Sequence, residues 1–314
     1  MKFGFHMFTR GATATPDNIA HVASHCEALG FDAFGVSDHV VVSTAIQSSY
    51  PYSPDGSWAG AAEGECLETL STLAYLAATT RRMRLFTSVM VLLHRPPVLA
   101  AKTLATIDVL SRGRLTIGAG VGWMKEELDL LGAPEFARRG AAANEYLRAF
   151  KTLWTDEEPK FAGEFVQFDD LMFAPKPVQP GGPPIWIGGE GTAARRRVAA
   201  VGDGWYPVSR NPRVPLDTLN RFRAALADVR ERTDAAGRDP DALQIALFAP
   251  HLRVGKAIVE DGERLAFTGE ASAIRDDIAA FEEAGLQTLV PNLDRPHVND
   301  IIVACNEFAE TVRM

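Results

Sequence analysis

The chain has 314 residues, of which 46% are hydrophobic and 23% are charged, and its formal net charge is -8. These proportions are typical of a folded globular protein with a large core, so extensive disorder is not expected. The acidic balance disfavours nucleic acid or an anionic membrane surface as the main partner, because either would need a basic face.

Cysteine usage and the N-terminus indicate a reducing compartment. Cys26, Cys66 and Cys305 are far apart in the sequence and lack C-x-x-C spacing, so we expect free thiols. His21 and His25 have i, i+4 spacing without a third ligand, and we expect no metal site. The first residues do not form a signal peptide, and no apolar run approaches roughly 18 residues. We therefore expect a cytoplasmic protein without a membrane span.

Short apolar runs alternate with amphipathic segments of helical length along the whole chain. Strands are predicted at residues 2–8, 32–37, 84–92, 115–119, 185–188, 204–207, 244–249 and 288–292. Helices are predicted at residues 16–29, 66–79, 97–110, 144–154, 192–201, 215–235, 272–284 and 297–312. Gly30, Gly237 and Gly285 follow three of these helices, where a left-handed cap is expected.

Strands that are each followed by a helix predict an α/β fold, specifically a (β/α)8 TIM barrel. No linker divides the chain, so we predict one domain over residues 1–314. Three segments interrupt the alternation: a loop at 40–65, a hairpin at 161–173 and a stretch at 255–269. Because active sites of such barrels lie at the carboxyl ends of the strands, these insertions are expected to form lids or substrate walls at that rim.

The second predicted strand ends in Ser37, Asp38 and His39. A histidine at this position can exchange a proton near neutral pH, and a neighbouring carboxylate can orient its ring. The alternative is a loop histidine beside a capping aspartate. His94, after the third strand, is open to two interpretations in the same way: it lines the pocket or only shapes the loop.

The segment GAGVGW at residues 118–123 has Trp123 where the third glycine of a dinucleotide-binding G-x-G-x-x-G motif would stand. A Rossmann domain is therefore not expected, and we interpret these glycines as positions where a flat ligand approaches the backbone.

The segment PPIWIGGEGTAARR reads as a strand, a tight turn and a helix start. Its turn runs from Gly188 through Gly189, Glu190 and Gly191 to Thr192. Backbone N–H groups at such a helix start can hold a phosphate group. A plain strand-to-helix turn is the alternative.

Taken in order, SDHV, TSVMVLLHRPP, GAGVGW and PPIWIGGEG resemble the luciferase-like monooxygenase superfamily. With YPYSPDG added, the series resembles its coenzyme F420-dependent oxidoreductase branch, over nearly the whole chain. The resemblance implies a cofactor ring near the barrel axis, backed by a non-prolyl cis peptide at Ser88–Val89. It also implies that the turn at Gly189 to Thr192 binds phosphate and that His39, oriented by Asp38, performs acid/base chemistry.

Some sugar-phosphate dehydrogenases of this branch carry a glutamate directly after the glycine that matches Gly122, where this chain has Trp123. Glu126 and Glu127 lie one helical turn further on and are not expected to replace that acid. An indole at the pocket edge instead indicates an apolar or aromatic substrate.

The resemblance predicts that F420 exchanges a hydride at C5 with a small organic substrate. An FMN-dependent monooxygenase using O2 is the alternative, and a barrel that binds ligand without turnover is a third possibility. The resemblance also implies a homodimer.

Overall fold

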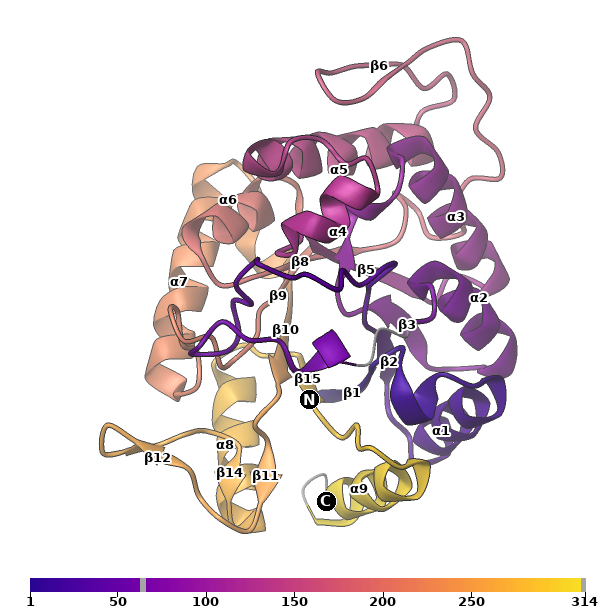
Figure 1. The fold of residues 1–314 in the computed structure, drawn as a ribbon. Helices are drawn as coiled ribbons and strands as arrows, with labels where there is room; N and C mark the ends of the chain where they lie inside the picture. Colours follow the sequence, from indigo (N-terminus) through magenta and orange to yellow (C-terminus); the bar gives the residue numbers. More distant parts are fainter. Residues whose placement is uncertain (63–65, 312–314) are drawn as a thin grey trace.

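The computed structural model describes residues 1–62 and 66–311 and confirms the (β/α)8 barrel (Figure 1). One parallel sheet has the strand order β3-β2-β1-β15-β10-β9-β8-β5-β4, and pairing of β3 with β5 closes it into a ring. Its strands are β1 (Lys2–Met7), β2 (Ala33–Val36), β3 (Arg84–Thr87), β4 (Met90–Val91), β5 (Leu115–Gly120), β8 (Ile185–Gly188), β9 (Gly204–Tyr206), β10 (Gln244–Ala249) and β15 (Thr288–Pro291).

Helices surround this sheet (Figure 1). They are α1 (Pro16–Ala28), α2 (Thr69–Thr79), α3 (Pro97–Leu110), α5 (Arg139–Thr155), α6 (Thr192–Val201), α7 (Leu219–Ala235), α8 (Ala271–Glu283) and α9 (Val298–Thr311), with the short α4 (Lys125–Leu130) after β5. Two helices begin later than predicted because side chains cap them. Glu68 accepts a hydrogen bond from the backbone N–H of Ser71, and Thr218 accepts one from Arg221.

The third predicted strand is not continuous. The peptide bond Ser88–Val89 is cis, as the resemblance implied, and it separates β3 from β4. β3 pairs with β2 and β5, whereas β4 pairs only with β5 among the described residues. A 3-10 turn at Leu92–His94 follows β4. The chain therefore reaches the rim after only two further strand residues, instead of continuing as one long strand.

Aromatic side chains fill the inside of the barrel beneath the strand ends. Phe86, Trp186 and Tyr206 form one buried cluster, with ring centroids 5.6 to 5.9 Å apart. Gly35 on β2 makes room for them, because a Cβ there would lie 2.3 Å from Cζ of Phe86. The barrel is therefore a packed core with its open end at the carboxyl ends of the strands.

The glycines of β5 and β8 make room for the bulge at the cis peptide. A Cβ on Gly118 would lie 2.0 Å from the carbonyl oxygen of Thr87, and one on Gly120 would lie 2.8 Å from Val89. A Cβ on Gly188 would also contact Val89, at 3.1 Å. The Val89 side chain therefore lies against all three glycines, which accommodate the bulge at the cis peptide. The close approach of a flat ligand to residues 118–123 stays a prediction.

The three predicted insertions follow β2, lie between α5 and β8, and follow β10. The hairpin predicted at 161–173 is present as β6 (Phe161–Ala162) and β7 (Gln167–Phe168). The stretch 255–269 contains the hairpin β12 (Val259–Glu260) and β13 (Glu263–Arg264), and β14 (Thr268–Gly269) pairs with β11 (Arg253–Val254). The loop after β2 crosses in front of the strands (Figure 1). Glu65 and Val312, which end a predicted loop and a predicted helix, lie outside the described residues.

No helix in the described ranges is long and apolar enough to cross a membrane. The cysteines carry free thiols, as predicted. Although Cys26 and Cys305 are far apart in the sequence, the fold buries them together with their sulfur atoms 3.9 Å apart. Gly30, Gly237 and Gly285 have positive φ angles, which confirms the predicted helix caps.

Replacing Gly118 by alanine is expected to destabilise the fold by about 1–3 kcal/mol or more, because its Cβ meets backbone that cannot move aside easily. Gly140, near the start of α5, is the matched control: its Cβ would meet only an arginine nitrogen at 3.4 Å. Urea unfolding of the two variants measures the difference. A Gly118→Ala protein as stable as Gly140→Ala would show that the bulge at Val89 is not tightly packed against β5.

Candidate active site

His39 lies at the end of β2, and its ring is held by Glu127 of α4. The Nδ1 atom of His39 is 2.8 Å from Oε2 of Glu127. The other carboxylate oxygen accepts hydrogen bonds from the backbone N–H groups of Val40 and Val41, at 2.7 and 3.2 Å. The sequence predicts that Asp38 orients His39. The structure corrects this point, because α4 turns the Glu127 side chain back onto the loop after β2.

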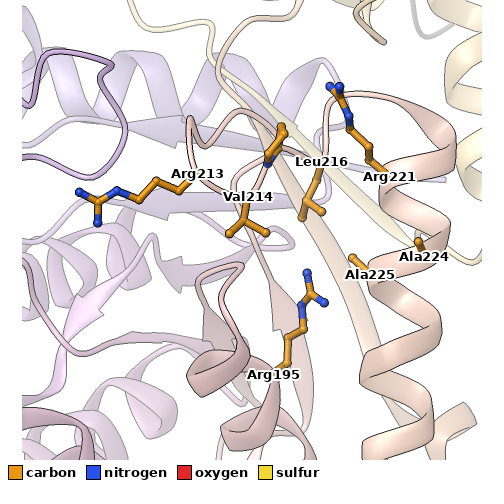
Figure 2. Close-up of a pocket in the computed structure, with 8 residues that line it drawn as sticks. Arg195, Arg213, Val214, Leu216, Arg221, Ala224 and Ala225 are labelled. Carbon is orange, nitrogen blue, oxygen red and sulfur yellow. The ribbon is translucent and has the colours of Figure 1, made fainter.

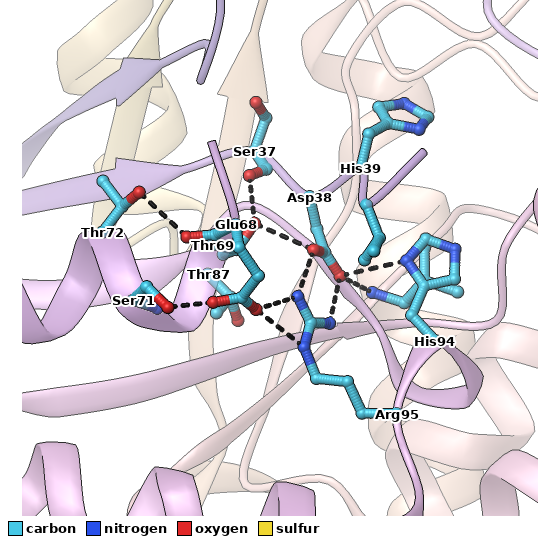
Figure 3. Close-up of polar contacts among 12 residues, drawn as sticks. Ser37, Asp38, His39, Glu68, Thr69, Ser71, Thr72, Thr87, His94 and Arg95 are labelled. Carbon is cyan, nitrogen blue, oxygen red and sulfur yellow. Dashed lines mark hydrogen bonds and ion pairs between the residues drawn. The ribbon is translucent and has the colours of Figure 1, made fainter. Parts of the chain in front are cut away.

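Asp38 is buried and faces the opposite way from His39 (Figure 3). Its two carboxylate oxygens accept hydrogen bonds from Arg95 at 2.8 and 3.0 Å. Further bonds come from the Thr69 hydroxyl and from the backbone N–H of Val91, both at 2.8 Å. Burial alone would raise the pKa of the Asp38 carboxyl, but His94 and Arg95 beside it hold that pKa far below its usual range. Asp38 therefore stays ionised and ties β2 to the segment after the cis peptide.

His94 is buried and lies between the carboxylates of Asp38 and Glu127. Its Nδ1 is 3.5 Å from Asp38 and its Nε2 is 3.5 Å from Glu127. Burial raises the pKa of Glu127, yet the hydrogen bond from His39 and the charges of the two histidines leave that pKa below its ordinary value. His39, Glu127, His94, Asp38 and Arg95 thus form a continuous row of alternating acidic and basic groups.

Aromatic rings from the loop after β2, together with Trp123 after β5, lie beside His39. The ring of Trp58 lies 4.6 Å from the His39 ring, and Trp123 lies 5.6 Å from Trp58. Tyr50 packs against Trp123 at 5.1 Å and against Tyr52 at 5.6 Å. These rings make an apolar wall on one side of the histidine. Trp123 was predicted to edge the pocket; Trp58 and Tyr50 were missed, although they are the last and first residues of the YPYSPDGSW segment.

The loop that carries these rings is fixed to α4. Glu126 accepts hydrogen bonds from the backbone N–H groups of Gln47 and Ser48, at 2.8 and 3.0 Å, and from the Ser48 hydroxyl at 2.7 Å. The Ser48 oxygen in turn accepts from the backbone N–H of Lys125. Two successive glutamates therefore have separate tasks: Glu127 holds the histidine, and Glu126 holds the loop above it.

Ser88, at the cis peptide, belongs to a hydrogen-bonded group inside the barrel. Its hydroxyl is 2.9 Å from Nδ1 of His6 on β1 and 2.8 Å from the hydroxyl of Tyr206 on β9. The backbone N–H of Ser88 donates to the carbonyl of Val36 at the end of β2. His6 and Tyr206 were not recognised in the sequence, because each lies within a buried strand without a motif around it.

The turn between β8 and α6 has two distinct faces. α6 begins after Gly191 without a side-chain cap, and a Cβ on Gly191 would meet open space. The Glu190 side chain folds inward, where its carboxylate accepts from the backbone N–H of Val208 and from Asn211, both at 2.7 Å. Burial raises the pKa of Glu190. Only the backbone of Glu190 is therefore available at this turn, and the helix start itself can receive an anion.

The remaining predicted residue of the rim, Gly122, adopts a positive φ of 81°, which favours glycine. Its carbonyl oxygen accepts a hydrogen bond from Arg139 of α5 at 3.2 Å. A Cβ on Gly122 would lie 2.9 Å from Val91, so this turn packs directly on β4.

A cavity of about 420 Å³ opens between α6 and α7 (Figure 2). It adjoins the turn before α6, because its lining residue Arg195 donates a hydrogen bond to the backbone carbonyl of Glu190 at 2.9 Å. Arg195, Arg213 and Arg221 line it together with apolar side chains. The guanidinium groups of Arg213 and Arg221 point in different directions (Figure 2), and Arg195 and Arg221 are paired with Asp228 and Asp217. Its arginines do not converge on one point, so we do not assign the cofactor ring to this cavity.

Solved structures share this fold over almost the full chain. They include monooxygenase RslO1 from Streptomyces bottropensis, with a TM-score of 0.75, 21% identity and coverage of 100% of this chain and 99% of that one. An F420-dependent secondary alcohol dehydrogenase in complex with an F420-acetone adduct has a TM-score of 0.75, 18% identity and coverage of 99% and 98%. At these identities, the similarity describes the fold alone.

Relatives are also found by sequence. An uncharacterized protein of Mycobacterium tuberculosis is 36% identical over 228 residues, which cover 72% of this chain and 79% of the relative. The family model described as luciferase-like monooxygenase matches residues 1–257. With this match and the barrel geometry above, the chain belongs to the luciferase-like monooxygenase family.

Proposed function

We propose that this chain is an F420-dependent oxidoreductase acting on a small organic substrate. The observation that carries the proposal is the His39–Glu127 pair at the end of β2. Asp38, the residue before His39, bonds the backbone N–H of Val91 just after the Ser88–Val89 cis peptide, so the acid/base pair and the bulge are held together. The choice of F420 follows the resemblance of the sequence to the F420-dependent branch, and the fold shared with an F420-dependent secondary alcohol dehydrogenase is compatible with it.

The described residues fit such a cofactor at two points. Ser88 and Val89 would lie behind its ring, and the backbone N–H groups from Gly189 to Thr192 would hold its phosphate. The open space at Gly191 and the uncapped start of α6 support the second assignment, because an anion there would satisfy N–H groups and the helix dipole. When bound, the cofactor would supply hydride transfer at C5.

The protein's own contribution is proton transfer at His39. The lowered pKa of Glu127 keeps its carboxylate ionised, and an ionised carboxylate can only accept hydrogen bonds. The Nδ1 atom of His39 therefore carries a hydrogen, and Nε2 is the atom that exchanges a proton with the substrate. The wall of Trp58, Trp123 and Tyr50 would exclude water and favour an apolar or aromatic substrate.

An FMN-dependent monooxygenase is the second candidate. The observation in its favour is an FMNH(2)-dependent dimethylsulfone monooxygenase of Pseudomonas putida, which is 33% identical over 174 residues covering 54% of this chain and 45% of the relative. Both cofactors carry a ring and a phosphate, so the same bulge and turn could serve either. The two candidates differ in the cofactor and in the use of O2.

Replacing His39 by alanine is expected to lower turnover by about 10²- to 10⁴-fold, the usual contribution of a positioned acid/base, and to change F420 affinity less than about threefold. Glu127→Gln is expected to lower turnover less, because the amide oxygen can still accept the hydrogen bond from Nδ1 of His39. Reoxidation of reduced F420 by a panel of unsaturated and carbonyl compounds provides the rate. His21→Ala, on the exposed side of α1, is the matched control. Unchanged turnover in His39→Ala would remove His39 from the mechanism.

A pair of substitutions at Gly191 tests the phosphate site. Aspartate and asparagine both cap helices well, and the backbone of Gly191, at φ -73° and ψ 164°, accepts either one. Both variants are therefore expected to unfold at or above the wild-type temperature. Gly191→Asp is expected to bind F420 and FMN at least about tenfold more weakly, because its charge repels phosphate, whereas Gly191→Asn keeps most of the affinity. Equal affinities of the two variants would place the phosphate elsewhere.

A further inference from the structure

The row of His6, Ser88 and Tyr206 inside the barrel mouth has no role in the proton transfer assigned to His39. Three different strand segments supply it: β1, the bulge after β3, and β9. The Ser88 hydroxyl is the middle member, 2.9 Å from His6 and 2.8 Å from Tyr206. His6 and Tyr206 are both buried, at 3% exposure each. The sequence distance between its members, up to 200 residues, shows that this row is a product of the barrel and not of one loop.

The hydrogens of this row leave one end unsatisfied. Burial, with a smaller effect from Arg10, lowers the pKa of His6 to about 3, so its imidazole is neutral and carries one N–H. The imidazole and the two hydroxyl groups therefore carry three polar hydrogens, but they form only two hydrogen bonds with one another. In either tautomer the Nε2 atom of His6 is left over, as a donor or as an acceptor. It is buried and has no hydrogen-bond partner in the described part of the chain.

The His6 ring cannot easily turn to find another partner. Its centroid lies 4.7 Å from the ring of Phe8 and 4.7 Å from the ring of Phe248. These two rings and the bond to Ser88 fix the plane of the imidazole. A buried polar atom held without a partner costs stability, and such atoms occur where a ligand or an ordered water completes the bond.

We propose that His6 is a ligand-contacting residue, whose Nε2 atom forms a hydrogen bond with a carbonyl oxygen or ring nitrogen of the planar cofactor. The inference rests on the proposed function, since it takes the cofactor ring to lie against Ser88 and Val89. Ser88 and Tyr206 act through His6. Ser88 is bonded to Nδ1 and Tyr206 to Ser88, so the direction of these two hydrogen bonds decides whether Nε2 is a donor or an acceptor. Because this contact is neutral, it is separate from the proton exchange at His39.

The proposal is tested with His6→Phe, which keeps a flat ring without nitrogen, and His6→Gln, which keeps a donor and an acceptor. Affinity for F420 and for FMN is measured by fluorescence titration at pH 5.5 to 8. His6→Phe is expected to bind the cofactor about tenfold more weakly than the wild-type protein at every pH, and His6→Gln is expected to recover part of that loss. The absorption band of the bound cofactor is also expected to shift in His6→Phe.

Thermal unfolding of the ligand-free proteins separates this role from a structural one. His6→Phe removes the unsatisfied Nε2 atom together with the bond between Nδ1 and Ser88, and these opposite effects are expected to leave the unfolding temperature nearly unchanged. A lowered unfolding temperature together with wild-type cofactor affinity and an unshifted band would overturn the proposal, because Nε2 would then serve the fold or hold a water. If the wild-type protein bound neither cofactor, the proposed function itself would fail. Wild-type binding with undiminished binding by His6→Phe would remove only the role of His6.

Discussion

The buried carboxylate of Asp38 is the interaction on which the open end of this barrel depends. A charge removed from water must be compensated, and Asp38 is compensated by groups from three separate places: Arg95 after β4, Thr69 at the start of α2, and the backbone N–H of Val91. These bonds fix the end of β2 against the segment that follows the cis peptide. His39 is the next residue along the chain. Asp38 therefore sets the position of His39 relative to the bulge through the backbone, although its side chain bonds other groups.

The two sides of the proposed cofactor site are built by different physical means. On the side of His39, the elements are held by charges: Glu127 and Glu126 both connect the loop after β2 to α4. On the side of Val89, they are held by close packing, because Gly118, Gly120 and Gly188 leave only the volume that Val89 fills. In the proposed site, the carboxylate contacts would fix the group that exchanges the proton, whereas the packing around Val89 would give the cofactor ring a firm surface.

The barrel could be predicted from the sequence because alternation of apolar strands and amphipathic helices is a local signal that repeats along the chain. The cis peptide came from the resemblance to a family, whereas the place of His39 at a strand end was predicted from the residues and the resemblance added its acid/base role. The partner of His39 could not be predicted, because 88 residues separate His39 from Glu127 and α4 is too short to show helical periodicity. His6 was missed for a related reason: an unsatisfied nitrogen is a property of the surrounding fold, and nothing in the residues next to it reveals it.

The central claim, that the bulge at Ser88–Val89 and the turn at Gly189 to Thr192 bind a deazaflavin, is tested most directly by titrating the purified protein with F420 and FMN in parallel. The change in cofactor fluorescence gives both dissociation constants under the same conditions. The account predicts tighter binding of F420. Tighter binding of FMN would contradict it and assign the chain to oxygen-using chemistry, and binding of neither would remove the cofactor site.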